Sequence, residues 1–197
     1  MPRKSSHLPR GLEAIHIRQA VEFVEREAGE LVDLYFDQAN VFSAIVGIFG
    51  AKALTAFSPY KKHKHPDTAQ QRFPDLSLDG RLNPPAAIAL ESKGSTRPRA
   101  IQSHYNHPGW YIVWRYVVDP TETFRAGKQV VVWRVDVVFL EESDWKYETS
   151  KAGSGRGGRT HTFGLIHPAK KLADAAAYHL PGVGIRGGKP ILIESSK

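Results

Sequence analysis

The chain has 197 residues, no cysteine, and 27 Lys and Arg against 20 Asp and Glu, which gives a formal net charge of +7. Without cysteine it has no disulfide framework, thiol nucleophile or iron–sulfur cluster, so a bound metal would need carboxylate, carbonyl, water or His ligands. The length predicts a single domain over residues 1–197. Its longest apolar stretch, 41–57, contains Lys52 and is too short to span a bilayer. The pI near 9.6 favours a polyanionic partner.

Residues 1–11 form a basic arm that lacks the apolar run and cleavage site of a secretory signal, which favours a cytoplasmic protein. Residues 12–58 predict helices. Apolar residues spaced three and four apart from Leu12 to Tyr35 indicate an amphipathic helix. A second, more uniformly apolar helix begins after Asp37 or Asn40, ends at Ser58, and is expected in the core. The basic stretch 60–72 predicts a surface loop that either contacts phosphate or faces solvent.

Residues 73–140 predict a sheet. In a first strand, 74–79, Asp75 and Asp79 share the polar face, and in a second, 87–93, Glu91 and Lys93 share one face. If these strands pair as a hairpin, one of the two aspartates faces Glu91 and Lys93 within about 5 Å. The runs 110–118 and 129–140 are almost continuously apolar and predict central strands covered on both faces.

Three further features follow in the chain. Arg134 and Asp136 lie two residues apart in a predicted strand, which indicates either a structural ion pair or a solvent-facing patch. Residues 150–164 are a Gly- and Arg-rich loop, in which Arg156 and Arg159 supply donors for phosphate or base edges. Pro168 predicts the start of a short helix that continues to about Tyr178.

The two carboxylates and the lysine on the predicted hairpin suggest hydrolysis of a phosphodiester. Enzymes that catalyse this slow reaction hold hard divalent ions on carboxylates and place a cation near the attacking water. Two neighbouring carboxylates repel each other unless a cation lies between them. Asp75, Glu91 and the main-chain carbonyl of Ser92 are suitable ligands for Mg²⁺, which prefers oxygen donors and retains water, and Lys93 would be the nearby cation.

The segments Pro74-Asp75 and, 16 positions after that acid, Glu91-Ser92-Lys93 resemble the motif of the PD-(D/E)xK nuclease superfamily. Over about residues 12–140, the resemblance implies an α/β, restriction-endonuclease-like fold, with a central mixed β-sheet flanked by helices. It implies that Asp75 and Glu91 bind Mg²⁺ and that Lys93 orients or activates the attacking water. Asp79 competes for the role of first acid but lacks the preceding proline. Glu25 or Glu27 could add a third acid from the first helix.

Within that superfamily, the short chain without a nucleotide-binding motif looks most like a type II restriction endonuclease. Such an enzyme cleaves double-stranded DNA as a homodimer, with Mg²⁺ and no nucleotide cofactor, and leaves a 5′-phosphate. The candidate DNA contacts are Arg97, Arg99, His104, Arg156 and Arg159. Two alternatives stay open, namely a structure-selective nuclease of the junction-resolvase or repair type and a non-catalytic DNA-binding protein.

Overall fold

The computed structural model describes residues 8–149 and 161–193 of the chain. The predicted basic arm therefore lies largely outside the described residues, as does most of the Gly- and Arg-rich loop.

The helices are α1 (Ala14–Gly29), α2 (Val32–Asp37), α3 (Ala39–Phe57) and α4 (Pro168–Lys171), with short 3₁₀ turns at Ala86–Ile88 and Glu142–Asp144. The strands are β1 (Tyr60–Lys61), β2 (Leu76–Leu78), β3 (Ala89–Ser95), β4 (Gln102–Ser103), β5 (Gly109–Val118), β6 (Val130–Leu140), β7 (Trp145–Thr149), β8 (His161–Leu165), β9 (Ala176–His179), β10 (Val183–Arg186) and β11 (Lys189–Leu192).

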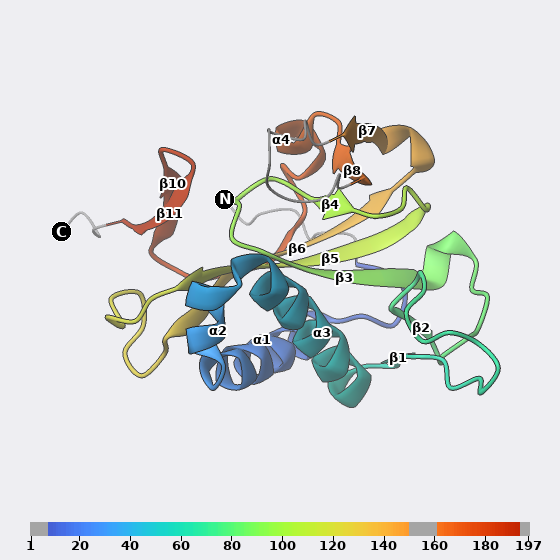
Figure 1. Ribbon diagram of the computed structural model, residues 1–197, viewed down its shortest axis with the longest axis horizontal. Helices are drawn as coiled ribbons and strands as arrows, with labels where there is room; N and C mark the ends of the chain where they lie inside the picture. Colours follow the sequence, from blue (N-terminus) through green and yellow to red (C-terminus); the bar gives the residue numbers. More distant parts are fainter. Residues whose placement is uncertain (1–7, 150–160, 194–197) are drawn as a thin grey trace.

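A mixed sheet of six strands, in the order β1-β2-β3-β5-β6-β9, lies at the centre of the molecule (Figure 1). Its neighbouring strands are antiparallel except β3 and β5, which are parallel. The two long apolar runs of the sequence are β5 and β6. Most of their residues are buried, because both faces of the sheet are covered at this point. The predicted α/β class with a central mixed sheet is confirmed.

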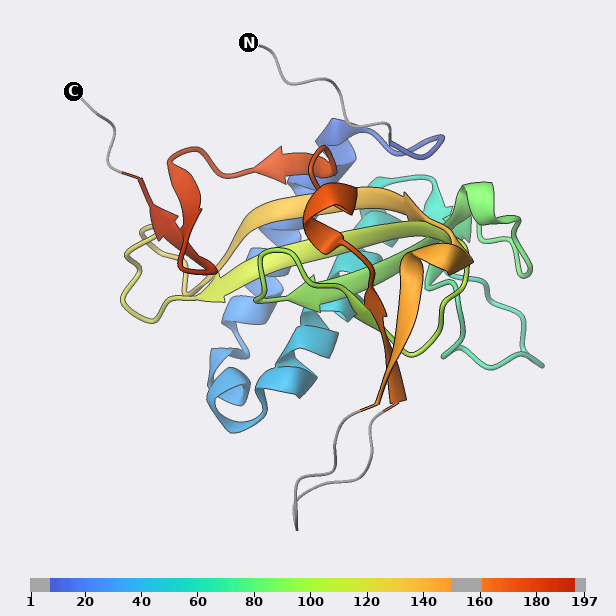
Figure 2. The ribbon, with the colours of Figure 1, turned by 90° about the horizontal axis from the view of Figure 1, so that it is seen from above.

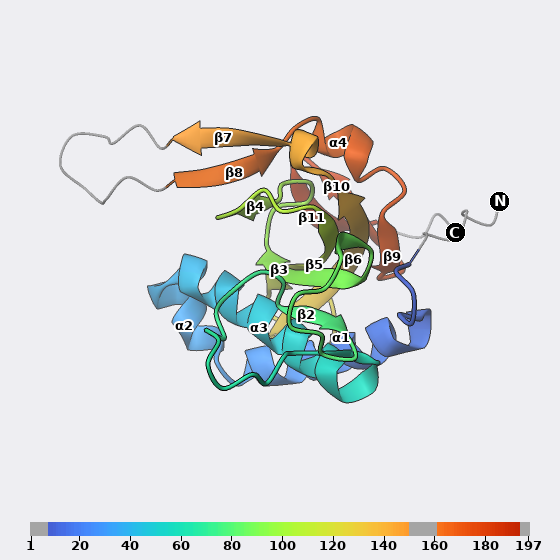
Figure 3. The ribbon, with the colours of Figure 1, turned by 90° about the vertical axis from the view of Figure 1, so that its right-hand side faces the viewer.

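Helices cover one face of this sheet, and a second, smaller sheet covers the other (Figure 3). α1 and α3 pack their apolar stripes on β3, β5 and β6, in a core that includes Ile17, Val24, Leu54 and Trp114. On the opposite face, the three-stranded sheet β4-β8-β7 and α4 enclose a smaller core around Tyr111. The β10–β11 hairpin lies to one side of both layers (Figure 2).

Three glycines allow α3 to approach β3 and β5 closely. A Cβ atom built on Gly50 would lie 1.9 Å from Nε1 of Trp114, and one built on Gly94 would lie 2.3 Å from the main-chain oxygen of Ser43. At Gly47 a Cβ would lie 3.1 Å from the main-chain oxygen of Ser92. The missing side chains thus let the helix backbone pack directly on the strand that carries Glu91 and Lys93.

Two predicted helices have different limits in the structure. The amphipathic pattern from Leu12 to Tyr35 is divided, because α1 ends at Gly29 and α2 begins at Val32. The helix that starts at Pro168 ends at Lys171, and residues 176–179 form β9 rather than continuing it. These residues pair with β6, so hydrogen bonds to the sheet prevail over the helical preference of the alanine run.

By length and composition α3 could cross a membrane. It packs instead against α1 and the sheet, where Phe42, Val46 and Leu54 are fully buried. These contacts place one side of the helix in the protein core. The other side of α3 is not covered, since Val41 and Ile48 are exposed there.

Candidate active site

The β2–β3 hairpin brings Asp75, Glu91 and Lys93 together, as the sequence predicts. Leu76 pairs with Leu90, which places Asp75, one residue before β2, opposite Glu91. The main-chain N–H of Asp75 donates to Oε2 of Glu91 at 3.1 Å, and the main-chain N–H of Ser92 donates to Oδ2 of Asp75 at 2.9 Å. Nζ of Lys93 lies 2.6 Å from Oε1 of Glu91. Two carboxylates and one ammonium group therefore meet at the start of β2.

The Glu91 carboxylate is held in an unfavourable environment for its charge. The residue is 8% exposed, and burial raises the pKa of Glu91 above its usual range. The negative charge of Asp75 raises this pKa further, while the ammonium group of Lys93 acts in the opposite direction. A divalent cation bound between the two carboxylates would favour the charged form of both.

The donor set fits a magnesium ion that keeps several waters. Within residues 8–149 and 161–193, no group of three or more Asp, Glu or His side chains gathers in a way that could hold a metal. Mg²⁺ commonly binds to proteins through only one or two carboxylates, together with water and substrate phosphate. Asp75 and Glu91 supply that number.

Ser92 contributes to the site in two directions. Its main-chain N–H donates to the carboxylate of Asp75. The N–H and C=O of one strand residue point to the same side of the strand, so the carbonyl oxygen of Ser92 also points to the side on which Asp75 lies. Its hydroxyl points to the helical layer, where it donates to the main-chain oxygen of Gly47 at 2.7 Å and accepts from Nε1 of Trp114 at 2.9 Å. The residue between the acid and the lysine is thereby fixed to α3.

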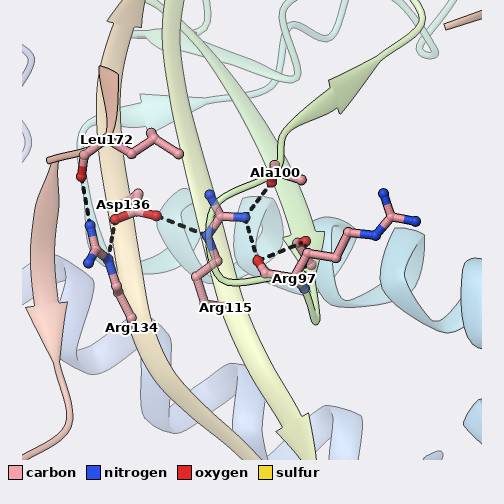
Figure 4. A network of polar contacts seen from close by, with 7 residues as sticks. Arg97, Ala100, Arg115, Arg134, Asp136 and Leu172 are labelled. Atoms are coloured by element: carbon pink, nitrogen blue, oxygen red, sulfur yellow. Dashed lines mark hydrogen bonds and ion pairs between the residues drawn. The ribbon is translucent and has the colours of Figure 1, made fainter. Parts of the chain in front are cut away.

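A buried ionic network lies on the same face of the sheet as Lys93. Lys93 is in register with Val113 on β5 and, beyond it, with Asp136 on β6. Asp136 accepts from Nε of Arg115 at 2.9 Å and from Nε of Arg134 at 2.5 Å, which confirms the predicted structural ion pair of Arg134 and Asp136 (Figure 4).

Arg115 extends this network to the loop that follows β3. Its Nη1 donates to the main-chain oxygens of Arg97 and Ala100, at 2.9 Å and 2.5 Å. Arg115 is fully buried, and among the described residues its Nη2 has no hydrogen-bond partner. The sequence pattern assigns no role to Arg115, although an arginine within an almost continuous apolar run is itself a signal of a buried polar contact.

The other predicted residues lie at varied positions. Arg97 and Arg99 are exposed on the loop after β3, and His104 is exposed on the loop after β4. Arg156 and Arg159 lie outside the described residues. Asp79, the competing first acid, is exposed at the turn after β2, where its φ is 59° and its main-chain N–H donates to the main-chain oxygen of Pro59.

The two candidates for a third acid have other partners. Glu25 is buried and accepts from the main-chain N–H of Val132 and from Arg125, while Glu27 pairs with the neighbouring Arg26. Val132 lies four residues along β6 from Asp136, the residue in register with Lys93. Glu25 is thus a structural link between α1 and β6.

The basic stretch after α3 is partly built into the fold. Nζ of Lys61 donates to the main-chain oxygens of Thr55 and Ser58, at the C-terminal end of α3 where the helix dipole favours a cation. His63 is buried, contrary to the prediction of a surface loop, whereas Lys64 and His65 are exposed.

Comparison of the chain with protein-family models, with curated proteins and with solved structures finds no match.

Proposed function

We propose that the protein is a Mg²⁺-dependent nuclease with a restriction-endonuclease-like fold that hydrolyses phosphodiester bonds of double-stranded DNA. The observation that carries the proposal is the meeting of Asp75, Glu91 and Lys93 on two adjacent strands. The resemblance of the Pro74-Asp75 and Glu91-Ser92-Lys93 segments to the PD-(D/E)xK motif is consistent with this use of the cluster.

In this proposal, Asp75, Glu91 and the Ser92 carbonyl would hold the metal. When bound, Mg²⁺ supplies a Lewis acid and a water of lowered pKa. Lys93 orients the attacking water and offers a positive charge to the phosphate oxygens. The water oxygen forms a bond to phosphorus and the bond from phosphorus to the 3′ oxygen breaks. The water loses one proton, and the leaving 3′ oxygen gains one. The products are a 5′-phosphate and a 3′-hydroxyl.

The basic loop after β3 would contact the DNA backbone. Arg97 and Arg99 are exposed and lie four and six residues after Lys93, while Arg115 fixes the main chain at Arg97 and Ala100. His104 is a third exposed donor. Restriction-type cleavage of both strands would require a homodimer with one site for each strand. A cytoplasmic location is part of the same proposal.

The test is incubation of phage and plasmid DNA with the purified protein, in Mg²⁺ or in EDTA. Asp75→Asn removes one carboxylate charge at the cluster, and Asp79→Asn makes the same change at the exposed turn, where Asn tolerates a positive φ. We expect Mg²⁺-dependent cleavage with wild type and Asp79→Asn, and none with Asp75→Asn. Discrete bands from linear DNA would indicate the restriction type. Binding without cleavage of linear or branched DNA would favour a non-catalytic DNA-binding protein.

A further inference from the structure

Four aromatic rings form a ladder that starts in the core and ends at the surface. Tyr111 is fully buried, and its ring centroid lies 6.2 Å from that of Phe73. Phe73 lies 4.8 Å from His107, and His107 stacks on Tyr105 at 5.3 Å with an interplanar angle of 26°. Tyr105 remains 56% exposed even with His107 on one side.

The buried end of the ladder adjoins the candidate active site. Phe73 precedes Asp75 by two residues, and Tyr111 on β5 is in register with Glu91 on β3. Burial raises the pKa of Tyr111, and the negative charge of Glu91 raises it further, as expected for a phenol close to that carboxylate. A Cβ atom built on Gly109 would lie 3.1 Å from Phe73 and 3.4 Å from Ala89, so the start of β5 packs on β3 and on the segment that precedes β2.

The loop that carries the outer two rings is held by contacts at several points. The main-chain N–H of Tyr105 donates to Oγ of Ser103 at 3.3 Å, and Asn106 donates to Glu142 at 3.2 Å. The hydroxyl of Tyr111 donates to the main-chain oxygen of His107 at 2.9 Å. An exposed ring on a backbone fixed in this way loses little conformational entropy when it binds a flat partner.

We propose that Tyr105, supported by His107, is a stacking platform for an unpaired nucleobase beside the phosphate that is cleaved. The proposal rests on the nuclease function proposed above and specifies its substrate as DNA with a single-stranded or extruded nucleotide at the cleavage point. Bases inside a duplex have both faces covered by their neighbours, so only an unpaired base can place a free face on a protein ring. The proposal favours the structure-selective type of nuclease over the restriction type.

Binding in EDTA tests the platform without cleavage. The probes are an oligonucleotide that carries 2-aminopurine, whose fluorescence falls when it stacks, and the same strand annealed to its full complement. We expect fluorescence quenching with the single strand, and a loss of affinity for it of about tenfold or more in Tyr105→Ala. Tyr105→Phe should bind within about twofold of wild type, because it keeps the ring. Affinity for the full duplex should change little in either variant.

Tyr147→Ala is the matched control, since Tyr147 is 52% exposed on β7 and contacts Phe163. It should leave binding of the single strand unchanged. An unchanged affinity of Tyr105→Ala for the single strand, or an equal loss for single strand and duplex, would overturn the proposal.

Cleavage in Mg²⁺ separates this inference from the function on which it rests. The inference predicts that wild type cleaves a flap or gapped substrate faster than a plain duplex of the same sequence, and that Tyr105→Ala removes this preference. Cleavage of both substrates at equal rates would overturn the platform and leave the nuclease standing. Quenching without cleavage of any substrate would support the platform and contradict the nuclease.

Discussion

The main-chain N–H of Asp75 donates to the carboxylate of Glu91, and this bond joins the two acids across the β2–β3 hairpin. The second link, from the N–H of Ser92 to the carboxylate of Asp75, runs in the opposite direction. Each carboxylate is therefore oriented by the backbone of the strand that carries the other. A register shift of one residue would move Glu91 and Lys93 to the helical face, so the pairing of Leu76 with Leu90 decides whether the cluster exists.

The close approach of α3 to the sheet predicts a strong effect of Gly50→Ala. The added methyl group would overlap the indole of Trp114, and overpacking of this kind costs about 1–3 kcal/mol. Gly29→Ala is the control, because nothing lies within 4 Å of a Cβ there and alanine favours a helix. Urea unfolding should show a lower free energy of unfolding for Gly50→Ala and an equal or higher one for Gly29→Ala. Equal effects of the two substitutions would contradict the packing described.

The buried position of Arg115 predicts that Arg115→Met destabilises the protein by about 3–5 kcal/mol, the usual cost of leaving a buried charge without its partner. Arg134 still pairs with Asp136, which favours the lower end of that range. Arg26→Ala removes an exposed ion pair and should cost about 0–1 kcal/mol. Thermal unfolding of both variants checks the contrast. Similar melting temperatures would mean that the Arg115 network contributes no more than a surface pair.

Glu25 predicts a pH dependence of stability. Its pKa is raised, chiefly by burial, and this is partly offset by Arg125 and the bond from Val132. Between the ordinary pKa and the raised one, the folded state holds a proton that the unfolded state releases, so this group's contribution to stability falls as pH rises. It is fully present below the ordinary pKa. Glu25→Gln cannot titrate and should flatten the slope by at most about 1.4 kcal/mol per pH unit.

Urea unfolding of wild type and Glu25→Gln from about pH 4 to 7 measures this slope, with the exposed Glu22→Gln as control. Parallel curves for wild type and Glu25→Gln would show that burial does not raise the pKa of this carboxyl.

The exposed arginines after β3 predict a change in the salt dependence of DNA binding. If Arg97 contacts a phosphate, Arg97→Ala should lower the slope of log affinity against log salt by about 1. Arg18→Ala, an exposed change on α1 at the other face of the sheet, should leave the slope as it is. Titrations of duplex DNA from about 50 to 200 mM salt distinguish these results. An unchanged slope in Arg97→Ala would remove this loop from the DNA interface.

The sequence predicts the parts of this fold and site whose signal is local. Alternation of polar and apolar residues places Asp75, Glu91 and Lys93 on one hairpin, and continuous apolar runs identify β5 and β6 as central strands. Contacts between distant segments leave no such pattern. The partner of Arg115 on the loop at Arg97 is such a contact, and so is the stacking of Tyr105 on His107 and of His107 on Phe73. The alanine run of β9 predicts a helix for the same reason, because the strand with which it pairs, β6, lies far away in the chain.

The most direct test of the proposed active site is to measure binding and cleavage of the same DNA by Lys93→Ala. Lys93 is partly exposed, so its removal leaves no cavity in the core and should keep the fold and the basic surface largely intact. Lys146→Ala, at an exposed lysine that pairs with Glu148, makes a matched change elsewhere. We predict that Lys93→Ala binds DNA within about threefold of wild type and loses Mg²⁺-dependent cleavage by about a hundredfold or more, while Lys146→Ala keeps both. Cleavage by Lys93→Ala at the wild-type rate, or an equal loss of binding and cleavage, would contradict the catalytic role of this cluster.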